Sequence, residues 1–373
     1  MVRNVEISIL MPTYNDEEYI EESIESVLAQ DFQNFELIIV NNGSTDNTDR
    51  IVKQYCGHTK VKCLAEKRLG QLNALYRVIN MINGRFILLL HSDDLLVDGS
   101  LDICYKTLVS NPNIDGVYSD LIKIDETGKE KGLIHTSNVI DPKLLLLFAG
   151  SNIIPDIFFV KREWFYRGVL RNYLLWNMPY WFYIEDNGSL KVANLKKVRP
   201  FYKYRVYSGN YINSDVGKFV SINGRIRTIL TLGRVFHLPC PKFQRLFEYV
   251  FSKSIPPFSI PPKQYPKNVI PFVEYAIKST YGRSVPWYVS YVLEYLKNYD
   301  PNKTIEIRLP GDIEVYYGRD VRQFYYDLHN NLVPDIYLEI IEKANEGFGK
   351  VKTNNKLKME IVLNFLNIPA TII

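Results

Sequence analysis

Cysteine is scarce in this 373-residue chain. The four cysteines form no CxxC pair, and no histidine stands near them at zinc-finger spacing: Cys56, Cys63, Cys104 and Cys240. This pattern gives no support to a finger-type zinc site or to a dense disulfide framework. We therefore expect four reduced thiols, as in a cytosolic protein.

An excess of one charge is also missing. The chain has 45 basic and 41 acidic residues, which leave a formal net charge of +4. A protein that binds nucleic acid usually has a concentrated basic face. We expect no nucleic-acid partner.

Long apolar runs are absent. The longest run after the first strand, Leu144–Ala149, is far shorter than the roughly 20 residues that a membrane helix needs. No basic segment followed by an apolar stretch precedes the first strand, so we predict no signal peptide. The segments 220–232 and 243–251 have helical apolar spacing with interspersed arginines, which suggests a membrane-surface contact. Packing on a neighbouring domain is the commoner arrangement, so we expect a cytoplasmic protein that is at most peripheral on the inner membrane face.

Two phosphate-binding fingerprints are missing as well. The first turn after a strand carries no GxGxxG, and the chain has no GxxxxGK[ST] loop. The usual nicotinamide-dependent and ATPase functions lose their main support.

The first third of the chain alternates short apolar runs with segments of helical spacing. A composition that is 46% hydrophobic is ample for a packed core. The expected strands are Val5–Met11, Phe35–Val40, Val61–Leu64, Arg85–Leu90 and Gly116–Asp120. Strands separated by helices of about ten residues imply right-handed crossovers and a parallel sheet. We expect the first strand to stop at Pro12, because proline fits poorly in a central strand.

Two adjacent carboxylates, Asp93 and Asp94, follow the fourth apolar strand. Ligands of such sheets bind outside the carboxyl ends of the strands. One or two carboxylates together with substrate phosphates are the usual way to hold Mg²⁺ or Mn²⁺. Acids after a strand also commonly cap the next helix, so the pair alone does not decide between the two functions.

Four motifs place this pair in a wider context. They are Met11-Pro-Thr-Tyr-Asn15, Val40-Asn-Asn-Gly-Ser-Thr-Asp46, Gly70-Gln-Leu-Asn-Ala74 and Gly84-Arg-Phe-Ile-Leu-Leu-Leu-His-Ser-Asp-Asp94. In this order they resemble the nucleotide-sugar domain of family 2 glycosyltransferases, and the resemblance covers roughly residues 5 to 207. It implies an α/β GT-A fold, a UDP- or GDP-linked sugar donor, Mg²⁺ or Mn²⁺, and inverting transfer by direct displacement at the anomeric carbon.

The resemblance also assigns site residues. Its donor-binding residues are Pro12, Tyr14, Asn42, Arg68, Gly70, Asp93 and Arg205, and its metal ligands are Asp94 and Asp93. Tyr14 would lie against the base and Asn42 would face the edge of the base. Asp94 would be the principal metal ligand, while Asp93 would bind the ribose or share the metal. Arg205 would pair with phosphate.

The acceptor half departs from the family pattern. The acidic general base would fall on Asn177 or Pro179, and neither can abstract a proton. The candidate bases are therefore the acids Asp186, Glu185 and Asp156. Tyr207 stands where the family usually has His, and a protonated phenol is a poor ligand for a hard ion.

We predict a GT-A domain over residues 1–215, with a nucleotide-sugar half at 1–120 and an acceptor half at 121–215. Residues 216–373 would form a mainly helical region, with a proline-rich linker near 254–268 and a hairpin turn at Pro310–Asp312. The predicted function is transfer of a sugar to a glycan, lipid-linked or protein acceptor. A nucleotide-sugar-binding or scaffold protein that has lost turnover is the alternative, and a nucleotidyltransferase is a third function that fits the four motifs poorly.

Overall fold

A computed structural model gives the architecture of the chain. It describes residues 5–67, 71–136, 159–171, 191–195, 199–210, 287–313 and 330–373, with single residues and short runs between 213 and 328. The chain divides into two compact units, and each is described by itself. The first comprises Met1–Pro142 and Asn152–Asn210, and the second comprises Lys143–Ser151 and Tyr211–Ile373.

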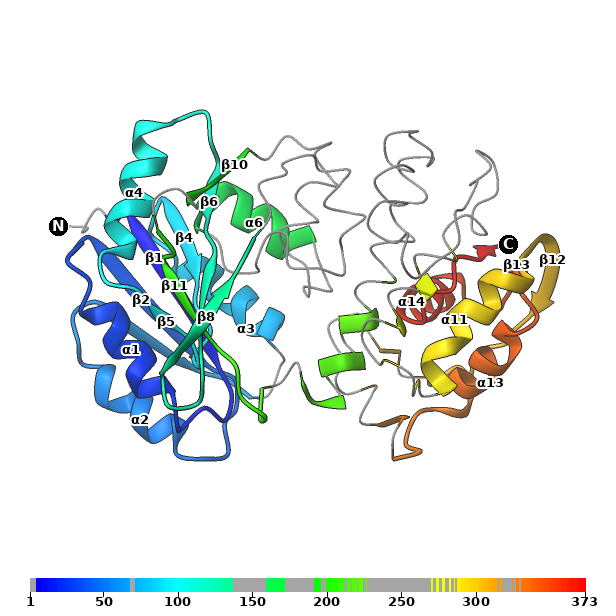
Figure 1. Cartoon of the computed structure of the whole chain (residues 1–373). Coiled ribbons are helices and arrows are strands. Elements are labelled where there is room, and N and C mark those ends of the chain that lie inside the picture. The colour runs from blue at the N-terminus through cyan, green and yellow to red at the C-terminus, as the bar shows by residue number, and fades with distance from the viewer. Residues whose placement is uncertain are drawn as a thin grey trace. The chain divides into compact units, whose positions relative to one another are not determined.

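The first unit is built on a seven-stranded sheet (Figure 1). Its strand order is β10 (Val192–Asn194), β6 (Gly116–Tyr118), β9 (Phe159–Lys161), β4 (Phe86–Leu89), β1 (Ile7–Thr13), β2 (Phe35–Asn41) and β3 (Val61–Ala65). Only β9 runs antiparallel to its neighbours among these strands. The predicted mostly parallel sheet is therefore confirmed.

The first strand runs further than we predicted. Pro12 lies inside β1, opposite Val40 of β2. On its other side β1 pairs with β4 only as far as Leu10, which lies opposite Leu89. Beyond Leu10 the pairing with β4 ends, and a proline without an N–H is tolerated there.

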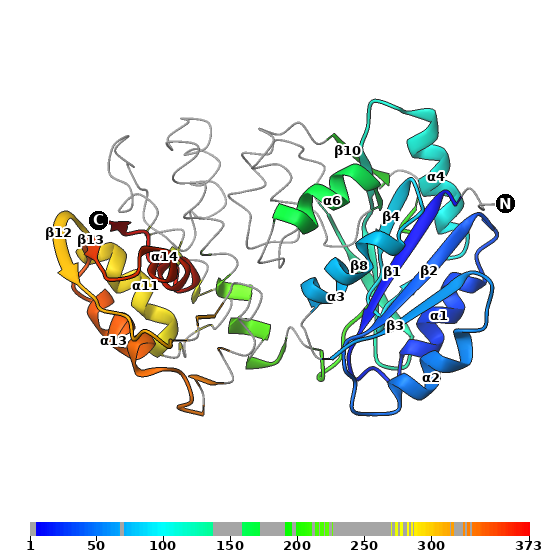
Figure 2. The ribbon, with the colours of Figure 1, turned by 180° about the vertical axis from the view of Figure 1, so that it is seen from behind.

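Helices cover both faces of this sheet. Helices α1 (Ile20–Leu28) and α2 (Thr48–Tyr55) lie on one face, and α3 (Gln71–Val78) and α6 (Arg162–Arg171) lie on the other (Figures 1 and 2). Ile20, Ile24 and Val27 of α1 are buried, as their helical spacing predicts.

The first unit also contains a four-stranded sheet. Its order is β5 (Leu95–Leu96), β11 (Tyr202–Arg205), β7 (Leu121–Ile124) and β8 (Glu130–Ile134). Strand β5 directly follows the carboxylate pair, so β11 is brought alongside Asp93 and Asp94.

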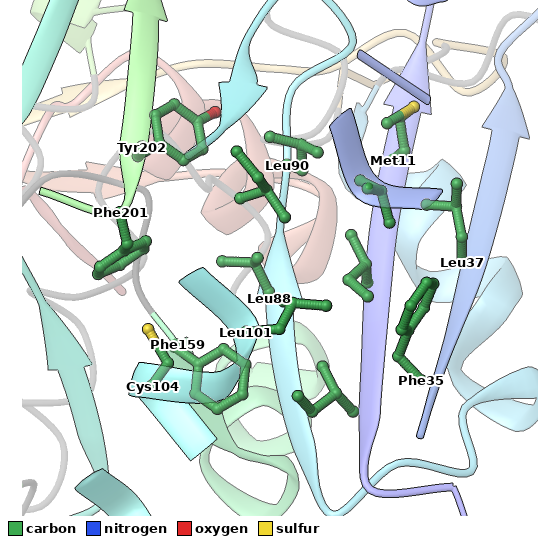
Figure 3. Packing of buried hydrophobic residues seen from close by; sticks show 14 of the residues in the cluster. Met11, Phe35, Leu37, Leu88, Leu90, Leu101, Cys104, Phe159, Phe201 and Tyr202 are labelled. Atoms are coloured by element: carbon green, nitrogen blue, oxygen red, sulfur yellow. The ribbon is translucent and has the colours of Figure 1, made fainter. Parts of the chain in front are cut away.

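The core of the first unit joins both sheets. Leu88 and Leu90 lie between Met11 and the aromatic residues Phe201 and Tyr202 (Figure 3). All of these side chains are at most 1% exposed. The core also takes in Leu101, Cys104 and Leu108 of α4 (Ser100–Ser110).

The cysteines differ from our prediction. Cys56, directly after α2, and Cys63 of β3 form a disulfide, whereas Cys104 is a buried thiol. The expectation of four reduced thiols was wrong because a turn after α2 brings residues seven apart to within 5.6 Å between their Cα atoms.

The second unit contains a parallel sheet that the sequence did not reveal. Strands β12 (Asp300–Glu306), β13 (Phe348–Lys352) and β14 (Thr371–Ile372) are accompanied by helices α11 (Trp287–Asn298), α13 (Asp335–Ala344) and α14 (Lys356–Phe365). The predicted hairpin at Pro310–Asp312 is wrong, because β12 pairs in parallel with β13, which follows α13.

The described residues cover only part of the chain on which the membrane predictions depend. Among the described residues, no helix has the length and apolar character needed to cross a bilayer. The two arginine-containing segments that suggested a membrane-surface contact lie mostly outside the described residues, as does the proline-rich linker.

Candidate active site

The loops after β1 and β2 are tied together at the carboxyl edge of the main sheet. The backbone N–H of Asn15 donates to Oγ of Ser44 at 3.0 Å, and its side-chain oxygen accepts from the N–H of Thr45 at 2.8 Å. Asn15 has a φ of 56°, a left-handed conformation that asparagine tolerates better than most residues. The two loops therefore form one rim.

Asp16 joins this rim to the loop after β4. One carboxylate oxygen accepts from Oγ1 of Thr13 at 3.0 Å, from the N–H of Tyr14 at 3.2 Å and from Oγ of Ser92 at 2.5 Å. Burial raises the pKa of Asp16, and the negative charge of Asp93 adds to the rise. Asp16 thus lies beside the carboxylate pair.

Asp94 is buried and fully engaged within the protein. Its two oxygens accept hydrogen bonds at 2.7 Å, one from the hydroxyl of Tyr202 and one from the backbone N–H of Arg205. Its side chain is 1% exposed, and burial raises its pKa well above the usual range. This carboxyl group fastens β11 to the end of β4, a geometry that speaks against the predicted role as principal metal ligand.

Asp93, in contrast, is partly exposed. Its carboxylate accepts a hydrogen bond of 3.3 Å from the side-chain amide of Asn210, which is itself 5% exposed. Burial raises the pKa of Asp93, while the charge of Arg205 and the bond from Asn210 oppose the rise. Of the two predicted metal ligands, Asp93 is the one that is partly exposed, whereas Asp94 is buried.

Arg205 does not face solvent, contrary to our prediction of a phosphate contact. Its side chain is 1% exposed and its guanidinium carbon lies 4.6 Å from the ring centroid of Tyr19. It donates to the carbonyl oxygens of Asp93, Asp125 and Glu126 and to the carboxylate of Glu22. With its donors satisfied inside the protein, Arg205 holds the β7–β8 turn and α1 against the site.

Tyr207 lies next to Asp93 and Asp16, which are both partly exposed. Its ring packs on Tyr19 with centroids 4.9 Å apart. Burial and the charges of Asp93 and Asp16 raise the pKa of Tyr207. The phenol therefore stays protonated at neutral pH and can donate a hydrogen bond.

The two residues predicted to contact the nucleotide base differ in their exposure. Tyr14 is partly exposed on the rim, whereas the side chain of Asn42 is 3% exposed. Its neighbour Asn41 is turned toward α2, where it donates to Asp49 and accepts from the N–H of Ser44, both at 3.0 Å. Asn41 therefore stabilises the turn.

Several predicted site residues lie outside the described residues. They are the donor-binding candidates Arg68 and Gly70, the candidate bases Asp156, Glu185 and Asp186, and the expected base positions Asn177 and Pro179.

Two residues of the site escaped the sequence analysis. Asp16 belongs to none of the four motifs, and its place beside Asp93 becomes visible only through its bond to Ser92 and the effect of the Asp93 charge on it. Asn210 carries no motif signal, because a buried amide that fixes a carboxylate becomes visible only in the folded chain.

A divalent ion is compatible with this donor set when the substrate supplies the other ligands. No cluster of three or more His, Cys, Asp or Glu residues suited to a metal occurs in the described part of the chain. Proteins commonly hold Mg²⁺ through one or two carboxylates plus substrate phosphates, and Asp93 offers one such carboxylate.

Comparisons with known proteins relate this chain to glycosyltransferases. The family model for glycosyl transferase family 2 matches residues 8–169. An uncharacterized glycosyltransferase of Rickettsia bellii (strain RML369-C) is 30% identical over 157 residues, which cover 42% of this chain and 21% of that protein. Another from Methanocaldococcus jannaschii is 32% identical over 126 residues, covering 33% of this chain and 43% of that protein. The matched part thus spans less than half of either relative.

A solved structure shares the fold. The crystal structure of S. aureus TarS 1-349 in complex with UDP-GlcNAc superposes with a TM-score of 0.51 and 14% sequence identity. The match covers 88% of this chain and 92% of that chain. At this identity the likeness concerns the fold, and it agrees with the mostly parallel sheet of the first unit. Residues 8–169 are therefore similar to glycosyl transferase family 2, and the fold is a mostly parallel α/β fold of the GT-A type.

Proposed function

We propose that this protein is an inverting glycosyltransferase that moves a sugar from a UDP- or GDP-linked donor to a hydroxyl of a glycan, lipid-linked or protein acceptor. The reaction would serve polysaccharide or glycoprotein assembly on the cytoplasmic side. The observation that carries the proposal is the position of the partly exposed Asp93, which follows β4 and lies beside the rim formed by the β1 and β2 loops. The ring of Tyr14 and the amide of Asn42 suit a nucleotide base. The carboxylate of Asp93 suits a divalent ion that binds a diphosphate.

On the nucleotide side, Tyr14 would stack on the base and Asn42 would bond to its edge. Asn42 suits this role because an amide both donates and accepts hydrogen bonds.

On the diphosphate side, Asp93 would hold Mg²⁺ or Mn²⁺, which when bound would neutralise the charge that develops on the departing nucleoside diphosphate. Tyr207 would donate its hydroxyl proton to a ligand oxygen without competing for the ion. We assign Asp94 a positioning role, since its oxygens accept from Tyr202 and Arg205.

A second candidate function is binding of a nucleotide sugar without turnover. The observation that favours it lies in the sequence, since the position expected for the general base falls on Asn177 or Pro179. Turnover of the donor distinguishes the two functions.

Calorimetric titration with UDP, GDP, UDP-GlcNAc and GDP-mannose, with and without Mn²⁺, tests the proposal. We expect at least one nucleotide to bind more tightly with Mn²⁺, and Asp93→Asn to weaken that binding by about tenfold or more. Asp98→Asn, an exposed aspartate shortly after it, is the matched control. If none of the four compounds binds, the proposal fails.

Asp94→Asn separates the two carboxylates. The amide can still accept from the N–H of Arg205 and can donate to the hydroxyl oxygen of Tyr202, so we expect the Mn²⁺ dependence to remain. A folded Asp94→Asn variant that loses this dependence while Asp93→Asn keeps it would reverse our assignment.

A further inference from the structure

A second acidic site lies at the same edge of the main sheet. Oδ2 of Asp120 is 2.8 Å from Nδ1 of His135, which directly follows β8. The side chain of Asp120 is 6% exposed, whereas that of His135 is 65% exposed. A buried carboxylate thus holds an imidazole that faces outward.

The hydrogen bonds of Asp120 fix this imidazole. Its other oxygen accepts from the backbone N–H and from Oγ1 of Thr136, both at 2.9 Å. The Oγ1 atom of Thr136 in turn accepts from the side-chain amide of Asn194 at 3.2 Å. An ionised carboxylate can only accept, so Nδ1 of His135 carries the proton and Nε2 presents its lone pair.

The strand order places the Asp120–His135 pair on the opposite side of β4 from the rim formed by the β1 and β2 loops. Strands β4 and β6 both pair antiparallel with β9, and Leu88 and Val117 lie opposite the same residue, Phe159. Their carboxyl ends are therefore two strand spacings apart, about 10 Å. Asp120 follows Val117 by the same three residues that separate His91 from Leu88. The rim lies on the β1 side of β4 and the pair lies on the β6 side.

We infer that His135, oriented by Asp120, is the general base that takes the proton from the acceptor hydroxyl. This rests on the proposed transferase function and fills the role for which the expected position holds no acid. A histidine held by a buried carboxylate is suited to taking a proton from a hydroxyl group, because the carboxylate orients the imidazole and stabilises the resulting imidazolium.

Nε2 of His135 takes the acceptor proton while the acceptor oxygen forms its bond to the anomeric carbon of the donor. The bond from that carbon to the diphosphate oxygen breaks, and the electron pair leaves with the nucleoside diphosphate. The imidazolium beside Asp120 then releases its proton to solvent.

Donor hydrolysis, with water as the acceptor, tests this without knowledge of the natural acceptor. The probes are UDP-GlcNAc and GDP-mannose with Mn²⁺, and release of UDP or GDP is the readout. We expect His135→Gln and His135→Ala to lower the hydrolysis rate by about 100-fold or more, with nucleotide affinity within a factor of about two. Added imidazole should restore part of the rate of His135→Ala, an effect that a purely structural role does not give.

Two further variants complete the set. Asp120→Asn should lower the rate by at least about tenfold, because its amide can donate to Nδ1 and leave the proton on Nε2. Thermal unfolding checks that this buried substitution keeps the fold. His58→Gln, an exposed histidine whose Nδ1 accepts from the N–H of Lys60, should hydrolyse the donor at the wild-type rate.

The outcomes are distinct. A wild-type rate in His135→Gln, a lost rate in His135→Ala that imidazole leaves unchanged, or a wild-type protein that binds the donor without hydrolysing it would overturn this inference and leave the nucleotide site standing. A wild-type protein that binds no nucleotide would overturn the proposed function itself.

Discussion

Tyr202 donates its hydroxyl to Asp94 across 108 residues of sequence, at a distance of 2.7 Å. Both side chains are at most 1% exposed, and the hydroxyl of Tyr202 also accepts from the N–H of His91 at 3.4 Å. Since a buried carboxylate without donors is costly, this bond stabilises the turn that exposes the neighbouring Asp93.

Tyr202→Phe should therefore destabilise the protein. We expect the free energy of unfolding to fall by about 1–3 kcal/mol, because the variant leaves a buried oxygen of Asp94 without its donor. Urea unfolding measures it, and Tyr76→Phe, an exposed tyrosine of α3, is the control. Equal midpoints for the two variants would show that the bond contributes little.

Glu36 should give stability a specific pH dependence. Its burial raises the pKa, but bonds from Lys62, Ser8 and Asn83 outweigh burial and lower it below 4.5. A depressed folded-state pKa means that the contribution is present above pH 4.5 and is lost as the pH falls through the folded value. Glu36→Gln should cost about 1–3 kcal/mol at pH 7 and much less near pH 3.

Thermal or urea unfolding at several pH values measures this difference. Glu163→Gln, at an exposed position of α6, provides the comparison. If the difference in stability between Glu36→Gln and wild type stays constant from pH 7 to pH 3, the expected pH dependence is wrong.

The disulfide between Cys56 and Cys63 should stabilise the first unit. Closing a loop of this length in the unfolded chain is worth about 2.5 kcal/mol in the chain-entropy description. Cys56→Ser, Cys63→Ser and the double variant should lose similar amounts of unfolding free energy. A reductant should lower the stability of the wild-type protein but not that of the three variants. Three variants with wild-type stability, together with a thiol titration that finds both cysteines free, would contradict the bond.

Asn210 should act on metal-dependent binding through Asp93. Without its amide, Asp93 loses a donor that fixes its carboxylate, so Asn210→Ala should weaken Mn²⁺-supported nucleotide binding by about tenfold. Affinity without Mn²⁺ should change little, and calorimetry separates the two conditions. Asn111→Ala, at the exposed end of α4, is the matched control. A loss of the same size without the ion would indicate a general loosening of the loop.

The sequence predicts the main sheet well because its strands are almost uniformly buried. Every residue of β1, β2 and β4 is buried, so each appears as a mostly apolar run, which Glu36 interrupts in β2. The parallel sheet of the second unit gives no such signal. Strand β12 begins Asp300-Pro-Asn-Lys and is largely exposed, so it resembles a loop in sequence.

The candidate site was predicted in place but not in detail. That two acids follow β4 is visible in the sequence, but which one is buried depends on Tyr202 and Arg205, more than one hundred residues away. Arg205 shows the same limit. A motif suggested phosphate binding, while its partners Glu22 and Asp125 come from segments that only folding brings near it.

The left-handed Asn15, with its bonds to Ser44 and Thr45, has a thermodynamic consequence for ligand binding. The two loops that would enclose a base are already held in one conformation by the protein's own hydrogen bonds. Little backbone entropy then remains to be lost when a nucleotide binds, so a larger share of each contact appears as affinity. Asn15 is thus a preorganising residue, whose replacement would raise the entropic cost of binding while leaving every ligand contact chemically intact.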